Sequence, residues 1–136
     1  MTPPLAAKRP LDHVAVAVHS IEQSRGVFEA LSGDSCTSPE TLQAQGVRVA
    51  FVGAVELIEP LGPDTTVGRF LQRQGQGLHH VAYRTQDLEA DLAWLDAAGV
   101  PLIDRTPRMG AGGHRIAFLH PSGTGGLLVE LVERPA

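Results

Sequence analysis

Hydrophobic and polar residues alternate with the two-residue period of a β-strand near the start of the chain. In residues 11–18, LDHVAVAV, His13, Ala15 and Ala17 fall on one side of the strand and three valines fall on the other. The valine side can pack beneath a helix, whereas the small alanines leave open space beside the imidazole of His13. A helix is predicted to follow, because Ser20 stands at the capping position of a segment with helical spacing.

The same order of elements returns in the second half of the chain. LHHVAY aligns with LDHVAV and places His80 on His13, at an offset of 67 residues. The same offset places RIAF (115–118) on RVAF (48–51), and Asp87 opens the second helical segment as a good N-cap. One offset that holds at separated places indicates an internal duplication.

Strand-like runs complete each half of the duplication. They lie at 46–53 and 54–60 in the first half and at 114–119 and 126–133 in the second. The weakly patterned stretch 34–45 is predicted to be a loop with at most one edge strand. Between the halves, PDTTVGRFLQRQG predicts a bridging helix over about 64–75, capped by Asp64.

These elements predict an α+β fold of two tandem βαβββ units, spanning about 11–62 and 78–133. We expect a single domain at 11–136, which follows a flexible N-terminal tail at 1–10. Two such units related by a pseudo-twofold axis are expected to form a curved half-barrel sheet. Equivalent residues of the two halves would then face a shared central cleft, and a functional site is expected there.

Composition narrows the class of protein. The chain has 136 residues, a size typical of one domain, with 43% hydrophobic residues and a formal net charge of −4. This charge provides no basic field for nucleic acid or for an anionic membrane, and no apolar run is long enough for a membrane helix. The tail has no apolar core of the kind found in signal peptides. A single cysteine, Cys36, favours a reducing compartment, so a cytoplasmic protein is expected.

Candidate chemistry centres on two histidines and two glutamates, one of each per half. His13 and His80 occupy equivalent points of the repeat, and Glu56 and Glu130 are each flanked by apolar strand residues. A buried carboxylate without a partner is costly, so each glutamate should neutralise or find a partner. Two imidazoles and two carboxylates form a suitable ligand set for a divalent ion such as Co, Mn, Ni, Zn or Fe. The sequence does not choose among these metals.

Each candidate has an alternative reading. A lone strand histidine is more often a satisfied core residue, and only the equivalence of the two histidines favours ligation. Glu59 competes with Glu56, and Glu133 competes with Glu130 but falls on the opposite strand face. His79 should also point away from the site and serve a structural role. Arg48 and Arg115 occupy equivalent positions and are expected to act structurally beside the strands. Three further histidines carry no assigned role: His19, His114 and His120.

Four segments carry a family resemblance over nearly the whole chain, from Leu11 to Glu133. They are LDHVAVAV, VELIEPLGPDTTVGRFL, GLHHVAYRTQDLEADLAWLDAAGV and RIAFLHPSGTGGLLVELVE. These segments resemble the methylmalonyl-CoA epimerases of the vicinal oxygen chelate superfamily, which have a glyoxalase-like fold. Carried over by motif position, the metal site of that family falls on His13, Glu56, His80 and Glu130.

The resemblance implies a 1,1-proton transfer at C2 of methylmalonyl-CoA. A divalent metal chelated by the substrate would stabilise the enediolate as charge develops. Exchange on both faces of that planar species requires two bases. Glu130 is expected to be both a displaceable ligand and a catalytic base. One branch of the family has a second base where this chain has Val49, so a metal-bound water or Gln45 is left as the candidate for the other face.

The resemblance also implies an acyl-CoA substrate and a homodimer. Two alternatives stay open: an isomerase of the glyoxalase I type, and a non-catalytic ligand-binding protein of the same fold, like the bleomycin resistance proteins. Five cations are candidates for the CoA phosphates, although an ordinary solvated role is favoured for each: Lys8, Arg9, Arg69, Arg73 and Arg108.

Overall fold

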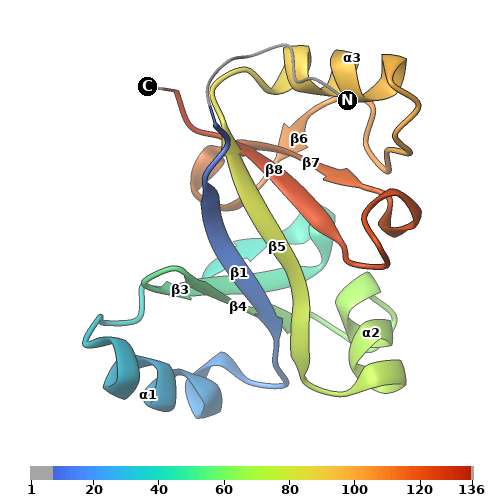
Figure 1. Ribbon diagram of the computed structural model, residues 1–136. Coiled ribbons are helices and arrows are strands. Elements are labelled where there is room, and N and C mark those ends of the chain that lie inside the picture. Colours follow the sequence, from blue (N-terminus) through green and yellow to red (C-terminus); the bar gives the residue numbers. More distant parts are fainter. Residues whose placement is uncertain (1–7, 136) are drawn as a thin grey trace. The chain divides into compact units, whose positions relative to one another are not determined.

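The computed structural model describes residues 8–135 of the chain, so residues 1–7 of the predicted tail lie outside the described part (Figure 1). Residues 8–135 contain eight β-strands and three α-helices. In chain order these are β1 (Leu11–Ala17), α1 (Ile21–Ser32), β2 (Glu40–Leu42), β3 (Val47–Val52), β4 (Val55–Pro60), α2 (Thr66–Gln74), β5 (Gly77–Thr85), α3 (Leu88–Ala97), β6 (Arg108–Met109), β7 (Arg115–Leu119) and β8 (Val129–Glu133).

Two compact units divide the described chain close to the boundaries of the predicted repeat. One unit comprises residues 13–79, and the other begins at His80 and includes residues 8–12. The strand order is β2-β3-β4-β1 in the first half and β6-β7-β8-β5 in the second. In each half the outer pairs are antiparallel, whereas β1 pairs with β4, and β5 with β8, in parallel. The two tandem βαβββ units predicted from the sequence are therefore confirmed, and the edge strand expected within 34–45 is β2.

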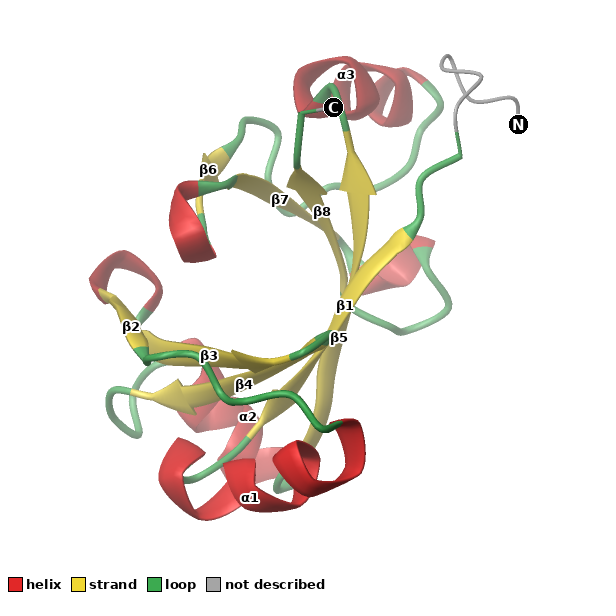
Figure 2. Ribbon diagram, turned by 90° about the vertical axis from the view of Figure 1, so that its left-hand side faces the viewer, coloured by secondary structure: helices red, strands yellow, loops and turns green. Residues whose placement is uncertain are grey.

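The core of the first half lies on the helix-facing side of its sheet. Strand alternation turns Ala50, Val52 and Leu57 to one side, where they pack with Ile21 at the start of α1. Figure 2 shows α1 lying along this face of β3 and β4. Burying the larger of these side chains, Ile21, Val52 and Leu57, stabilises the unit by roughly 1.5–3 kcal/mol each. The opposite face of the sheet carries the polar residues of β1 and β4, His13 and Glu56.

The second half repeats this arrangement with equivalent residues. Leu88 and Leu92 of α3 pack against Ala117, Leu119 and Leu131 of β7 and β8. A second cluster covers the other face of the strands, and it contains Ala82, Ile116, Phe118 and Val132. Each half therefore has one apolar face that binds a helix and one mixed face that is available for chemistry.

The helix starts follow the predicted caps in two of three cases. The Ser20 hydroxyl accepts a hydrogen bond from the N–H of Gln23, and the Asp87 carboxylate accepts one from Ala90. The prediction of Asp64 as the cap of α2 is wrong. Thr65 is the N-cap, and its Oγ1 accepts from the N–H of Gly68 at 3.0 Å.

The reason lies in the turn that leads into α2. A Cβ at Gly68 would lie 2.3 Å from the carbonyl oxygen of Gly62 and 2.8 Å from that of Pro63. The helix therefore starts in close contact with this turn. Thr65 Oγ1 also donates to the Gly62 carbonyl at 2.7 Å, which places the threonine at the capping position.

A glutamate at the end of β4 and of β8 ties each sheet to its helix. Glu59 accepts a hydrogen bond from the N–H of Ile21 at 2.9 Å and pairs with Arg48 at 3.1 Å. In the second half Glu133 accepts from the N–H of Leu88 at 3.0 Å and pairs with Arg115 at 3.0 Å. The first free N–H groups of both helices are thereby satisfied. The structural role expected for the two arginines is confirmed.

The hairpins that follow β3 and β7 differ in length. Gly53 and Ala54 join β3 to β4, and Gly53 adopts a φ of 57°, which glycine tolerates without strain. Residues 120–128 join β7 to β8 and include a 3₁₀ turn at Pro121–Gly123. The longer connection adds seven residues, so the offset between the halves is 67 before the hairpin and 74 after it.

None of the helices within residues 8–135 reaches the length and hydrophobicity that a membrane-crossing segment requires.

The ion pair of Glu133 predicts a pH-dependent contribution to stability. Its pKa lies below the ordinary 4.5 because Arg115 and the N–H of Leu88 both stabilise the carboxylate. This contribution is present at neutral pH and is lost as the pH falls through the lowered pKa. We expect Glu133→Gln to lower the free energy of unfolding by about 1 kcal/mol at pH 7. The difference should shrink as the pH falls below 4.5 and vanish once the pH is below the lowered pKa. Urea denaturation at several pH values measures this.

The matched control is Glu89→Gln. Glu89 also pairs with Arg115, at 2.6 Å, but its side chain is 66% exposed. This change should have little effect on stability at any pH. An equal loss in both variants would contradict the role assigned to the helix contact.

Candidate functional site

The first half of the chain contains a buried pair of His13 and Glu56. His13 Nε2 lies 3.3 Å from Glu56 Oε1, and the side chains are 5% and 7% exposed. The pair follows from the strand register, because Ala15 of β1 lies directly opposite Glu56 of β4. His13 is two residues before Ala15 and therefore shares its face of the sheet. Two residues far apart in sequence are thus held together by main-chain pairing.

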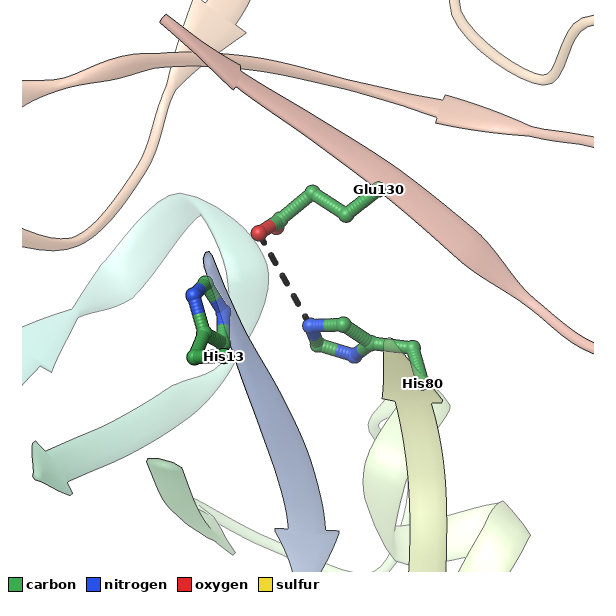
Figure 3. Close-up of side chains that lie close together, drawn as sticks. All are labelled: His13, His80 and Glu130. Carbon is green, nitrogen blue, oxygen red and sulfur yellow. Dashed lines mark ion pairs between the residues drawn. The ribbon is translucent and has the colours of Figure 1, made fainter. Parts of the chain in front are cut away.

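The second half repeats this pair with His80 and Glu130. His80 Nε2 lies 3.8 Å from Glu130 Oε1, with side-chain exposures of 3% and 8%. Figure 3 marks this ion pair with a dashed line and also labels His13. The register is equivalent, since Ala82 of β5 lies opposite Glu130 of β8. The structure therefore brings together the predicted histidine and glutamate within each half.

Two phenylalanines complete the duplicated arrangement, and the sequence reasoning missed them. Phe51 packs against His13 with ring centroids 5.4 Å apart and planes at 85°. Phe118 packs against His80 at 5.2 Å and 87°. Each phenylalanine is the antiparallel partner of the site glutamate, Glu56 or Glu130. The signal was present, because both residues end the duplicated R-x-A-F motif.

The side chains in each half suit a divalent metal ion. Imidazole nitrogen and carboxylate oxygen are ligands of intermediate transition metals and zinc, with bonds near 2.0–2.2 Å. Two atoms bound tetrahedrally to one ion at that distance lie about 3.3–3.6 Å apart. The 3.3 Å separation of His13 and Glu56 falls in this range, and the 3.8 Å separation of His80 and Glu130 is slightly longer. The donor set therefore fits the predicted cofactor.

The competing acids are excluded by their positions. Glu59 and Glu133 lie on the helix-facing side of each sheet, where they bind helix N–H groups and arginines. His79 lies on the other face from His80 and packs against Phe70 of α2, with ring centroids 4.9 Å apart. Burial lowers the pKa of the His79 imidazole below 6.5, so the ring is neutral near pH 7. These residues serve packing and helix capping.

The remaining histidines lie elsewhere. His19 is exposed at the entry to α1, His114 contacts Arg134 at 2.8 Å, and His120 Nδ1 accepts from the N–H of Ser122 at 3.0 Å. The last contact caps the 3₁₀ turn of the long hairpin.

Val49 is buried on the same face of β3 as Phe51, with 3% exposure. Its directly opposite neighbours are Ile58 on β4 and Glu40 on β2. Gln45, the other candidate for the second face, lies in the 3₁₀ turn Gln43–Gln45 that precedes β3. Val49 therefore offers no acid–base group, and the residue opposite it on the outer strand β2 is a glutamate.

The candidate CoA-binding cations differ in their surroundings. Arg9 makes a two-point pair with Asp91, at 2.8 and 2.6 Å. Arg69 donates to the carbonyl of Asp64, and Lys8 and Arg73 are exposed. Arg108 differs from these, because its guanidinium carbon lies 5.4 Å from the ring centroid of Phe118 on the site face.

Comparison with known proteins agrees with this geometry. The profile of the glyoxalase/bleomycin resistance protein/dioxygenase superfamily matches residues 12–118. The chain belongs to this superfamily. Among solved structures, methylmalonyl-CoA epimerase of Streptomyces coelicolor in complex with 2-nitronate-propionyl-CoA is 34% identical, with a TM-score of 0.87, over 96% of this chain and 97% of that one. The predicted glyoxalase-like fold class is thereby confirmed.

Relatives in sequence agree with the structural match. The uncharacterized protein YqjC of Bacillus subtilis is 46% identical over 90% of this chain and 91% of its own length. The mitochondrial methylmalonyl-CoA epimerase of Dictyostelium discoideum is 33% identical over 91% of this chain and 78% of its own length. The resemblance to the epimerases drawn from the sequence motifs is confirmed.

The packing of Phe118 on His80 predicts a measurable coupling. Edge-to-face aromatic pairs contribute about 0.5–1.5 kcal/mol beyond the burial of their area. A double-mutant cycle of Phe118→Leu and His80→Ala, measured by urea denaturation with a chelator present, should give a coupling energy in that range. The equivalent cycle at Phe51 and His13 is expected to give a similar value. Coupling within about 0.3 kcal/mol of zero at both pairs would contradict an energetic role for these contacts.

Proposed function

We propose that this protein is a metal-dependent epimerase that inverts C2 of methylmalonyl-CoA by a 1,1-proton transfer. The observation that carries the proposal is the buried His–Glu pair with its packed phenylalanine, built twice from equivalent residues. The epimerase names of relatives and structural neighbours at 32–35% identity support the choice of reaction.

We propose that one divalent ion is held jointly by His13, Glu56, His80 and Glu130. All four side chains are buried, and each half of the chain supplies one imidazole and one carboxylate that lie close together. Two imidazoles and two carboxylates give a neutral site when the divalent ion is bound, which lowers the cost of burying both carboxylates. When bound, the ion supplies Lewis-acid stabilisation of negative charge at the substrate's carbonyl oxygens.

Side chains of this protein are proposed to remove the C2 proton and to return it. The hydrogen beside a thioester carbonyl is only weakly acidic, so its removal needs a base held close to the carbon. Glu130 is the proposed base: its carboxylate is buried and held by the β5–β8 and β7–β8 pairing. The apolar neighbours Ile116, Phe118 and Val132 limit the access of water to this carboxylate. Exchange on the other face needs a second acid–base group, and Gln45 or a metal-bound water is the candidate proposed from the sequence because Val49 cannot serve.

We also propose a cytoplasmic location and a homodimeric assembly. A cytoplasmic location agrees with the single Cys36, and a homodimer is expected from the family resemblance. Sedimentation analysis of the purified chain measures the oligomeric state.

Deuterium uptake tests the reaction directly. The metal-loaded protein in heavy water should exchange the C2 hydrogen of methylmalonyl-CoA and interconvert its epimers, and mass spectrometry with chiral analysis measures both. Exchange no faster than in buffer would overturn the epimerase proposal. A parallel assay with methylglyoxal and glutathione identifies an isomerase of the glyoxalase I type. Ligand binding without either turnover would identify a non-catalytic binding protein.

Metal stoichiometry tests the shared site. We expect one divalent ion per chain, because both His–Glu pairs would bind the same ion. His13→Ala and His80→Ala should each weaken metal binding by at least about 100-fold while the fold is kept. Metal analysis after dialysis, with circular dichroism for the fold, measures this. His120→Ala is the control, since that histidine only caps a turn. One ion retained by His80→Ala would show that the pairs act separately.

A further inference from the structure

Apart from His13 and Glu56, Glu40 is the one ionisable residue on the site face of strands β1–β4. The strand register shows this, because residues directly opposite one another in an antiparallel pair extend to the same face. Glu40 lies opposite Val49, which shares its face with Phe51, and Phe51 packs on His13. The other residues of β1–β4 on this face have apolar side chains.

Main-chain contacts on both sides of Glu40 fix its place on this face. The N–H of Phe51 donates to Thr37 Oγ1 at 2.9 Å, and the N–H of Thr37 donates to the Phe51 carbonyl at 2.9 Å. On the other side of Glu40, Leu42 pairs with Val47 in the β2–β3 ladder. The carboxylate is therefore carried by a paired segment whose position relative to Phe51 is set by the backbone.

The register also gives the spacing between Glu40 and Glu56. Val49 and Ile58 are paired neighbours that connect the two glutamates across the face, and they are 3% and 5% exposed. Two strand intervals of about 4.8 Å and two residues of about 3.3 Å place the Cα atoms of the glutamates about 12 Å apart. The side chain of glutamate is long and flexible, so the Glu40 carboxylate can cover much of this interval. A small acyl group held at Glu56 would therefore have a carboxylate within reach across an apolar surface.

The duplicated half shows that the common scaffold does not require an acid at this place. Ile116 of β7 is the counterpart of Val49, and its neighbour on the outer strand β6 is Arg108. A residue needed only for the fold would not have the opposite charge in the other copy. The carboxylate of Glu40 is thus a feature of the first half alone.

We propose that Glu40 is the second acid–base group of the epimerase, in place of Gln45. The inference rests on the proposed function for the reaction and for the role of Glu130. An amide such as that of Gln45 neither accepts nor releases a proton near neutral pH, whereas a carboxylate does both. Glu40 is also exposed, so it can exchange its proton with water between turnovers.

The proton transfers balance as follows. Glu40 removes the proton from one face of C2: the C–H bond breaks, its electron pair delocalises onto the thioester carbonyl, and the proton goes to a carboxylate oxygen. The protonated form of Glu130 then donates a proton to the other face, which forms the new C–H bond and inverts the centre. In the reverse direction the two carboxyl groups exchange roles.

Glu40→Gln tests the assignment, because it keeps the size of the side chain and removes its ability to accept a proton. We expect kcat for epimerisation to fall by about 100- to 10,000-fold in both directions. The Kd for methylmalonyl-CoA and the metal content should stay within a few-fold of wild type, because a base acts on substrate that is already bound. Chiral chromatography, calorimetric titration and metal analysis measure these quantities.

Glu40→Asp distinguishes a base from a residue that only supports the fold. It keeps the carboxylate but withdraws it by one methylene, so proton transfer at residue 40 should become rate-limiting. With substrate deuterated at C2, the isotope effect on kcat should rise in the direction in which residue 40 removes the proton. In the opposite direction residue 40 only donates, and the substrate isotope effect should fall toward one. A structural role would change the two directions alike.

The control is Glu22→Gln, which removes the same charge from the same half. Glu22 lies in α1, on the helix side of the sheet, and its side chain is 84% exposed. It should change neither kcat nor Kd.

Three results would count against the inference. Epimerisation by Glu40→Gln at a rate near wild type would overturn it alone and return the role to Gln45 or to water. Loss of substrate binding in Glu40→Gln, or equal isotope effects in both directions for Glu40→Asp, would also overturn it while the wild-type reaction stands. Wild-type protein that exchanges no C2 hydrogen above the buffer rate would overturn the proposed function, and this inference with it.

Discussion

Main-chain pairing around the two site glutamates is the constraint on which the site depends. Glu56 has a parallel neighbour, Ala15, and an antiparallel neighbour, Phe51, and Glu130 has Ala82 and Phe118 in the same places. This register brings the histidine two residues before each alanine onto the face of the carboxylate. A slip of one residue would turn the glutamate to the helix side of the sheet and remove the pair. Backbone hydrogen bonds therefore determine where the imidazole and the carboxylate of each half meet.

Helix packing on the apolar face of each sheet is what allows the other face to bury polar side chains. On one side, aliphatic residues bind the helices, and Glu59 and Glu133 extend this attachment by accepting hydrogen bonds from the first helical residues. This leaves the other side free to bury groups that would be costly in an ordinary core. Edge-on phenylalanine rings then hold the imidazoles in place without competing for their nitrogen atoms. A rigid scaffold of this kind is what a chelating site needs, since it limits the rearrangement required on binding.

Much of the fold and of the candidate site could be predicted from the sequence because both depend on local pattern. Period-two alternation and the repeated HVA motif identified His13 and His80, and apolar neighbours identified Glu56 and Glu130. What the pattern did not reveal depends on distant contacts. Asp64 and Thr65 are both good caps, and only the approach of Gly68 to the preceding turn decides between them. Phe51 and Phe118 read as ordinary core residues. At the offset of 67, Glu56 falls on Gly123, so self-alignment alone does not pair the two acids.

The unequal hairpins show how such a protein can vary without losing its chemistry. The strands on either side of residues 120–128 resume the same ladder that Gly53 and Ala54 close in the other half. Extra length is taken up outside the paired region, so the carboxylate in β8 occupies the register position that its counterpart has in β4. The connection between β7 and β8 is thus a natural place for evolution, or for an engineer, to graft new recognition segments while the reactive centre is left intact.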